Sequence, residues 1–140
     1  MAFKHILTEL KDGVATLTLN RAPVNVLNIE MMEEINTYLE GLMKEKSLKL
    51  LVIQAMGKAF SAGVDVGEHL GDLVYKMIEV FHRMFRLMDA LKVPSIAVVN
   101  GSALGEDANW PSTATWSLQQ KKQSLDNLRS KLESFHLLLR

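Results

Sequence analysis

Two short apolar runs, at residues 50–53 and 96–99, constrain the fold of this 140-residue chain more than any other feature. Both runs (LLVI and IAVV) contain β-branched residues and no polar residue, which is typical of a strand buried on both faces of a sheet. Each run follows a segment in which apolar residues recur at helical spacing, at 31–46 and at 74–91. Because strands that alternate with helices form a parallel sheet covered by the helices, the pattern predicts an α/β layered domain.

A β-hairpin is predicted at the start of the chain. Residues 6–10 and 14–19 are β-type runs that flank Asp12-Gly13, and Asp-Gly supplies the positive φ angles of a tight hairpin turn. Apolar residues and threonines alternate along the second run, so the hairpin should cover a core on one side only. Asn28 stands where it can cap the first helix. The expected order is hairpin, helix, strand, loop, helix, strand.

Composition excludes several functional classes. The 16 basic and 16 acidic residues balance, so no broad electrostatic field favours nucleic acid or an anionic membrane. The chain has no cysteine, which excludes disulfides and thiolate metal sites. No apolar run approaches the roughly 20 residues that a membrane helix needs, and the first residues do not read as a signal peptide. We therefore expect a cytoplasmic protein that binds no metal, nucleic acid or membrane.

Loops of small residues follow both apolar runs, at 57–67 and at 101–105. In such loops, peptide N–H groups can point at one position and stabilise negative charge that develops on an oxygen. Two such turns at the ends of two strands could direct one donor each at a single carbonyl. Taken alone, however, loops of this kind are more often ordinary turns than binding sites.

Three blocks strengthen the functional interpretation: LNR with NVL at residues 19–27, GKAFSAGVDV at 57–66, and PSIAVVNGSALG at 94–105. In this order they resemble the signatures of the enoyl-CoA hydratase/isomerase, or crotonase, family. The resemblance implies a spiral of ββα units that forms trimers or dimers of trimers. It also implies acyl-CoA thioester substrates with no metal or redox cofactor. Residues 1–105 are then the N-terminal part of a crotonase-like domain. Residues 106–140 do not follow the family pattern and are interpreted as an aberrant tail, so the domain is expected to be truncated.

The resemblance also implies roles for individual residues. Position by position, the Ala62 N–H matches the first donor of the family's oxyanion hole. An enolate formed from a thioester places charge on its carbonyl oxygen, and two N–H donors there lower the barrier. The implied contacts with acyl-CoA come from two segments: Ala22, Asn25, Val26 and Leu27 in the first, and Ala62, Gly63, Val64 and Asp65 in the second. The stretch SAGVDVGEH is most similar to hydratases that act on cyclic dienoyl-CoA.

The chain departs from the family pattern after Gly105. Glu106 occupies the position of the second oxyanion donor, where the family has glycine. Asn109 falls at the first catalytic glutamate, and an amide cannot exchange protons as a general base must. Residues 117–140, in which leucines recur at heptad spacing from Leu118, replace the segment of the second glutamate, and their spacing predicts an amphipathic helix. We therefore expect the chain to be inactive.

Loss of one base at the Gly105 codon explains this change of pattern. Each original codon would then combine the last base of one present codon with the first two bases of the next. Trp110 followed by Pro111 then reads GCC, alanine, and Trp116 followed by Ser117 reads GTC, valine. With suitable choices of the free base, the restored frame reads GGGCELAVYCDMVIA and later AKFGQPEIKVGVFPP. These stretches contain the glycines and both glutamates that the resemblance requires.

A frame-shifted acyl-CoA hydratase is thus our leading interpretation, and two others remain. The chain could be a non-catalytic CoA-binding or assembly module whose C-terminal helix contacts a partner. It could also be a fragment too unstable to function, because half a core leaves apolar helix surfaces uncovered. We interpret Lys58, His69 and His82 as surface or boundary residues, since no ligand spacing joins them to other site residues.

Overall fold

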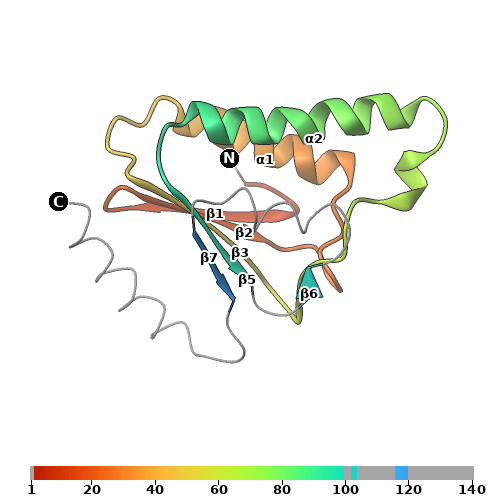
Figure 1. Ribbon diagram of the computed structural model, residues 1–140, viewed down its shortest axis with the longest axis horizontal. Helices are drawn as coiled ribbons and strands as arrows, with labels where there is room; N and C mark the ends of the chain where they lie inside the picture. Colours follow the sequence, from red (N-terminus) through yellow and green to blue (C-terminus); the bar gives the residue numbers. More distant parts are fainter. Residues whose placement is uncertain (1, 100–101, 104–115, 120–140) are drawn as a thin grey trace.

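The computed structural model describes residues 2–99, 102–103 and 116–119, which form an α/β fold of two layers (Figure 1). The main sheet has five strands in the order β1-β2-β3-β5-β7, and β1 is antiparallel to β2 while the other neighbours are parallel. Its strands are β1 (Ile6–Lys11), β2 (Val14–Leu19), β3 (Leu50–Ala55), β5 (Ser95–Val99) and β7 (Trp116–Gln119). A second sheet pairs β4 (Ala59–Ser61) with β6 (Ser102–Ala103). The helices are α1 (Ile29–Leu42), the short 3₁₀ helix η1 (Val66–His69) and α2 (Leu73–Ala90).

The predicted hairpin is confirmed. Asp12 and Gly13 have φ angles of 53° and 81°, the two positive values that a type I′ turn requires. A Cβ on Gly13 would lie 2.6 Å from the carbonyl oxygen of Ser47, so this position also needs glycine for space. The turn places Lys11 opposite Val14 and sets the register of the whole hairpin.

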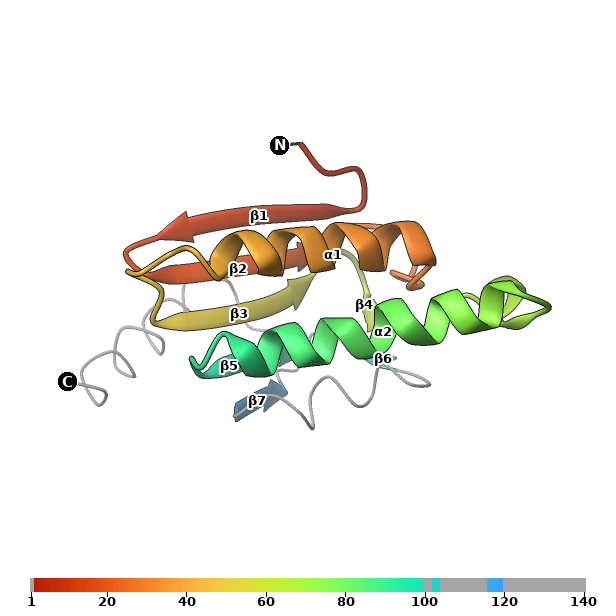
Figure 2. The same cartoon turned by 90° about the horizontal axis from the view of Figure 1, so that it is seen from above.

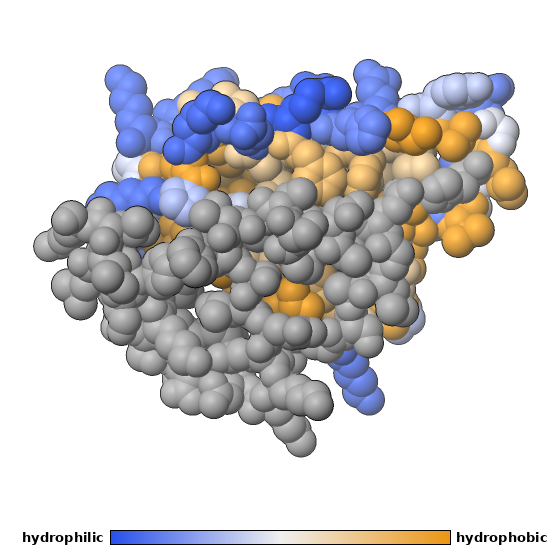
Figure 3. Space-filling model, viewed as in Figure 1, coloured by the Kyte–Doolittle hydropathy of each residue, from blue (hydrophilic) through white to orange (hydrophobic). Residues whose placement is uncertain are grey.

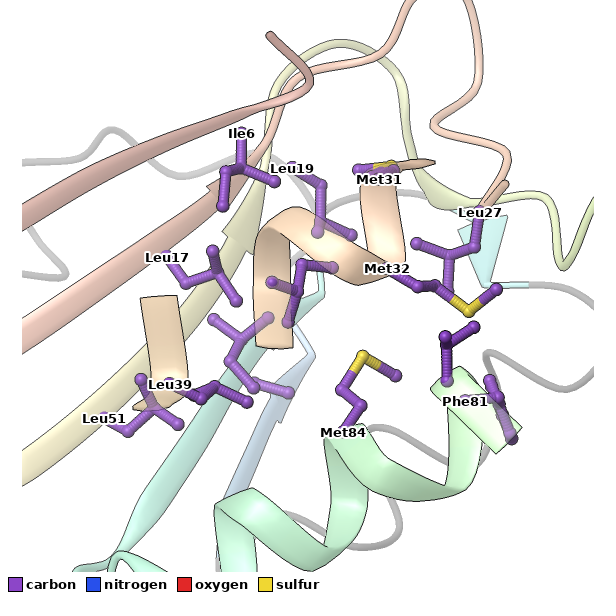
Figure 4. Packing of buried hydrophobic residues seen from close by; sticks show 14 of the residues in the cluster. Ile6, Leu17, Leu19, Leu27, Met31, Met32, Leu39, Leu51, Phe81 and Met84 are labelled. Atoms are coloured by element: carbon purple, nitrogen blue, oxygen red, sulfur yellow. The ribbon is translucent and has the colours of Figure 1, made fainter. Parts of the chain in front are cut away.

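Helices α1 and α2 lie side by side on one face of the main sheet (Figures 1 and 2). The principal core fills the space between the sheet and the helices, and side chains such as Leu17, Leu51 and Leu39 meet there (Figure 4). Strand β3 contributes to both faces. Its Leu51 belongs to the principal core, whereas Leu50 packs with Ile96 on the other face. The prediction that residues 50–53 are buried on both faces is therefore confirmed.

The structure corrects three predictions. Helix α1 ends at Leu42, not near Lys46. The predicted loop at 57–67 contains β4 and the first two residues of η1. The predicted helical tail is wrong for residues 117–119, because they lie in β7, which pairs in parallel with β5. An open strand edge carries unpaired N–H and C=O groups, and pairing of a short segment there satisfies them.

The rest of the tail, 120–140, lies outside the described residues, as do Glu106 and Asn109. In the described part of the chain, none of the helices is both long and apolar enough to span a membrane.

Candidate functional site

The two loops of small residues start from neighbouring strands and run together. Strands β3 and β5 are adjacent in the main sheet, so their C-terminal ends lie side by side. Beyond these ends the chain forms β4 and β6, which pair in parallel with Ala59 opposite Ser102 and Ser61 opposite Ala103 (Figure 2). This pairing supports the prediction that both loops serve one site. Residues 104–106, including the predicted second donor position at Glu106, lie outside the described residues.

The first loop is joined to the segment at 22–27 by a series of main-chain hydrogen bonds. The Ala62 N–H donates to the Val24 carbonyl oxygen at 3.0 Å. The Leu27 N–H donates to the Gly63 oxygen at 2.9 Å, and the Asp65 N–H donates to the Leu27 oxygen at 2.8 Å. The two segments that the resemblance assigned to acyl-CoA binding are therefore one structural unit.

Asn25 anchors this unit from within. Its side chain is 1% exposed, and its φ of 52° lies in the left-handed region that asparagine tolerates. The Asn25 Oδ1 accepts from the Arg21 N–H at 2.8 Å, while Nδ2 donates to the carbonyl oxygens of Met56 at 2.8 Å and Ala59 at 3.0 Å. All these bonds are internal, so the side chain of Asn25 holds the loop in place.

The other predicted wall residues differ in exposure. Ala22 is exposed and Val26 is half-buried, whereas Leu27 is fully buried. Any ligand along this segment would therefore contact Ala22 and Val26 before Asn25 or Leu27.

The geometry distinguishes Val64 from Ala62 as a candidate donor. The Ala62 N–H, predicted to face the thioester, is already bonded to Val24, and the Gly63 N–H donates to the Ser61 Oγ at 3.3 Å. Because a trans peptide is planar, its C=O and N–H point in opposite directions. The Gly63 C=O is held toward Leu27, so the Val64 N–H points away from Leu27, and it has no acceptor among the described residues.

Glu68 is a structural residue that sequence reasoning missed. Its Oε2 accepts from the Ile29 N–H at 2.7 Å, next to the predicted Asn28 cap, whose Oδ1 accepts from the Met31 N–H at 3.0 Å. A carboxylate at this position also complements the partial positive charge of a helix N-terminus. Asp65 likewise serves the backbone, since its Oδ1 accepts from the Gly67 N–H at 2.8 Å. Glu68 thus joins the candidate site to α1.

The remaining candidates stay at the surface where they are described. Lys58 and His82 are exposed, and the side chain of His69 lies outside the described part of the chain. The resolved pKa shifts fall elsewhere in the fold. Hydrogen bonds from His5 and Lys4 lower the pKa of Glu30, and a hydrogen bond to Glu33 raises the pKa of Lys76.

Comparison with known proteins identifies the class to which this fold belongs. A model of the enoyl-CoA hydratase/isomerase family matches residues 9–114, which is most of the chain. The fold also matches an enoyl-CoA hydratase/isomerase family protein from Silicibacter pomeroyi, with a TM-score of 0.72 and 28% identity over 80% of this chain and 50% of that one. The chain therefore belongs to the enoyl-CoA hydratase/isomerase family.

Two curated relatives illustrate the range of the family. The chain is 34% identical over 130 residues to the trans-2-decenoyl acyl-carrier-protein isomerase of Streptococcus mutans, covering 87% of this chain and 49% of the relative. It is 33% identical over 110 residues to the crotonyl-CoA hydratase of Syntrophomonas wolfei, covering 75% of this chain and 42% of that relative. The chain thus spans about half the length of the curated relatives it matches.

Proposed function

We propose that the chain carries one part of an acyl-thioester site of the hydratase type, and that it does not complete the reaction by itself. In the complete reaction, water adds to an enoyl- or dienoyl-CoA, and an enolate forms whose oxygen is held by two N–H donors. The observation that carries the proposal is the pairing of β4 with β6, which brings together the two segments that lead into the predicted donors.

We assign the first donor to the Val64 N–H instead of the Ala62 N–H. The Ala62 N–H would have to leave the Val24 carbonyl before it could bind a thioester oxygen. The Val64 N–H needs no such rearrangement, because its peptide is already turned away from Leu27. Donors that are oriented in advance stabilise developing charge without reorganisation cost.

The sequence after Gly105 argues against turnover by this chain. Hydration needs a base to activate water and an acid to protonate carbon, and the resemblance assigns these roles to two glutamates. Asn109 stands at the first of these positions, and the leucine-rich tail replaces the segment of the second. The main-chain donor can orient a thioester but cannot transfer a proton.

Restoration of the reading frame tests this proposal. One base is inserted after the Gly105 codon, and the gene is extended to its natural stop. The repaired protein should hydrate crotonyl-CoA or a cyclic dienoyl-CoA, whereas the present chain should show no turnover. The loss of the enoyl-thioester absorbance measures the reaction. An early stop in the restored frame, or the absence of a glutamate after its glycines, would contradict the frame-shift explanation.

Ligand binding separates this proposal from the binding-module alternative. Because the resemblance assigns the other wall of the thioester site to the family segment that the tail after Gly105 replaces, we expect the chain to bind crotonyl-CoA more weakly than a micromolar dissociation constant, which corresponds to about 8 kcal/mol. Calorimetry with the purified chain measures this directly. Micromolar affinity without turnover would favour a non-catalytic CoA-binding module.

A further inference from the structure

We propose that the Ser61 hydroxyl is a positioning group that sets the direction of the Val64 N–H, an inference that rests on the proposed function. Ser61 is the last residue of β4 and is fully buried. It does not reach the candidate donor directly. Its influence passes through Gly63, which lies between them in the sequence.

Two hydrogen bonds at the Ser61 hydroxyl have opposite roles. The Ser61 Oγ donates to the Asn25 carbonyl oxygen at 2.6 Å and accepts from the Gly63 N–H at 3.3 Å. The short bond to Asn25 fixes the hydroxyl proton, so a lone pair of Oγ remains for Gly63. The hydroxyl therefore joins the amide of Gly63 to a buried part of the chain.

Gly63 is the point at which the peptide directions are decided. Its φ of 101° is positive, a conformation that glycine adopts without steric cost and that other residues avoid. The peptide before Gly63 is held by Ser61 through the Gly63 N–H, and the peptide after it is held by Leu27 through the Gly63 oxygen. Because glycine has the widest conformational freedom, both bonds are needed to fix the orientation of the second peptide, which carries the Val64 N–H.

Asn25 makes the acceptor of the Ser61 proton rigid. Three side-chain hydrogen bonds hold Asn25 to Arg21, Met56 and Ala59. A continuous series of contacts thus runs from the turn after β3, through Asn25 and Ser61, to Gly63. Removal of the Ser61 hydroxyl interrupts this series. The Gly63 N–H then loses the Ser61 Oγ as its acceptor, and the Asn25 carbonyl oxygen loses the Ser61 hydroxyl as a donor.

Amide hydrogen exchange measured by NMR tests the role of Ser61 without any ligand. In Ser61→Ala, the Gly63 amide should exchange about five- to tenfold faster than in the unmodified chain, and the Val64 amide resonance should move. Ser61→Thr keeps the hydroxyl and should retain slow exchange at Gly63. The matched control is Thr18→Val, which removes another buried hydroxyl, one that accepts from the Gln54 Nε2 at 3.0 Å, far from Gly63 in the sequence.

The control should leave the Gly63 and Val64 amides unchanged. Exchange at Gly63 within about twofold of the unmodified chain in Ser61→Ala would overturn the inference. Equal acceleration of the core amides of Leu17 and Ile53 would also overturn it, because the effect would then be a general loss of stability. If Ser61→Ala does not fold, the comparison of Ser61→Thr with the unmodified chain decides: faster exchange at Gly63 despite the retained hydroxyl overturns the inference.

A second titration separates this inference from the proposed function. Crotonyl-CoA is added at millimolar concentration to the unmodified chain, and the Val64 amide is followed. Movement of this resonance supports Val64 as the donor. If it does not move while Ser61→Ala still alters Gly63 and Val64, the proposed thioester site fails and the positioning role of Ser61 stands.

Discussion

The two long helices lie on the same face of the sheet but are held very differently. Helix α1 has 14 residues, seven of which are buried, and Asn28 caps its N-terminus. Helix α2 has 18 residues, of which four are buried, and Asp72 at its N-cap makes no side-chain capping bond. The first turns of α2 expose Leu73, Tyr75 and Ile78, and apolar surface is visible at this end of the molecule in Figure 3.

This difference shows that neighbours, more than periodicity, decide how much of a helix is buried. Both helices have regular apolar spacing in the sequence. Helix α1 packs against the sheet on one side and against α2 on another, whereas the first turns of α2 extend past the strands (Figure 2). Ion pairs join the two helices along their outer surface, Lys76 with Glu33 at 2.9 Å and Arg83 with Glu40. The two helices should therefore respond unequally to equivalent changes.

The largest contrast is expected from truncation of apolar side chains. Leu39 in α1 is fully buried, and Leu39→Ala should lower the free energy of unfolding by about 2–5 kcal/mol because it removes packing and leaves a cavity. Leu73 in α2 is 50% exposed, and Leu73→Ala should change stability by about 0.5 kcal/mol or less. Urea unfolding followed by circular dichroism measures both. Equal losses in the two variants would remove the contrast between the helices.

Removal of the two N-cap side chains should give a smaller contrast. Asn28→Ala breaks the bond from the Met31 N–H and should cost about 1 kcal/mol. Asp72→Ala breaks no capping bond and serves as the control, with little expected change. The difference in urea midpoint between the two variants tests the asymmetry of the helix starts. A larger loss in Asp72→Ala would show that α2 depends on its cap in solution.

The stability of the fold at alkaline pH should depend on Tyr38 in α1. Burial, with a further contribution from Glu9, raises the pKa of Tyr38 to about 12 from its usual 10.0, and its hydroxyl donates to the Glu9 carbonyl oxygen at 3.2 Å. The folded state therefore favours neutral Tyr38. The resulting stabilisation is complete below pH 10 and is lost as the pH rises toward 12.

Thermal unfolding between pH 9 and 12 measures this loss, with Tyr38→Phe as the control. The stability of Tyr38→Phe should fall less steeply across this range, because phenylalanine has no proton to lose. Identical pH profiles would show that the Tyr38 hydroxyl does not contribute.

The smallest effect on stability is expected at the exposed end of α2. Tyr75 is 76% exposed, so Tyr75→Ser should change the free energy of unfolding by less than about 0.5 kcal/mol. The same change should reduce any concentration-dependent self-association, because it removes apolar surface from the exposed end of the helix. Sedimentation velocity over a range of concentrations measures this. A loss of stability comparable to that of Leu39→Ala would mean that the tyrosine is covered in solution.

Features that depend on adjacent residues could be predicted from the sequence. The hairpin turn follows from the conformational preferences of Asp12 and Gly13, and the start of α1 follows from the capping preference of Asn28. Both elements formed where they were expected, since each needs only a few consecutive residues. The buried strand at 50–53 could also be predicted, because an uninterrupted apolar run with β-branched residues is typical of a strand buried on both faces.

Features that depend on contacts between distant residues could not be predicted in this way. Glu68 reaches the start of α1 from a position 39 residues along the chain, and no local spacing indicates that pairing. Strand β4 has three residues, too few for a periodic pattern. The resemblance implies the Ala62 N–H as the first donor, but the direction of a peptide depends on its hydrogen-bond partners, here Val24 and Leu27. The heptad spacing of the tail predicted a helix from Ser117, where pairing with β5 produced a strand.

The direction of the Val64 N–H, away from Leu27, has a consequence for genetic studies of this site. The proposed donor belongs to the main chain, and every amino acid except proline supplies the same N–H group. A mutational scan of position 64 would therefore show that many side chains are tolerated, and it would not test the main-chain N–H, which is the proposed donor. Replacement of Val64 by its α-hydroxy acid, which exchanges one amide for an ester, removes the N–H and keeps the side chain. Chemical synthesis of the backbone can thus detect a function that codon changes cannot.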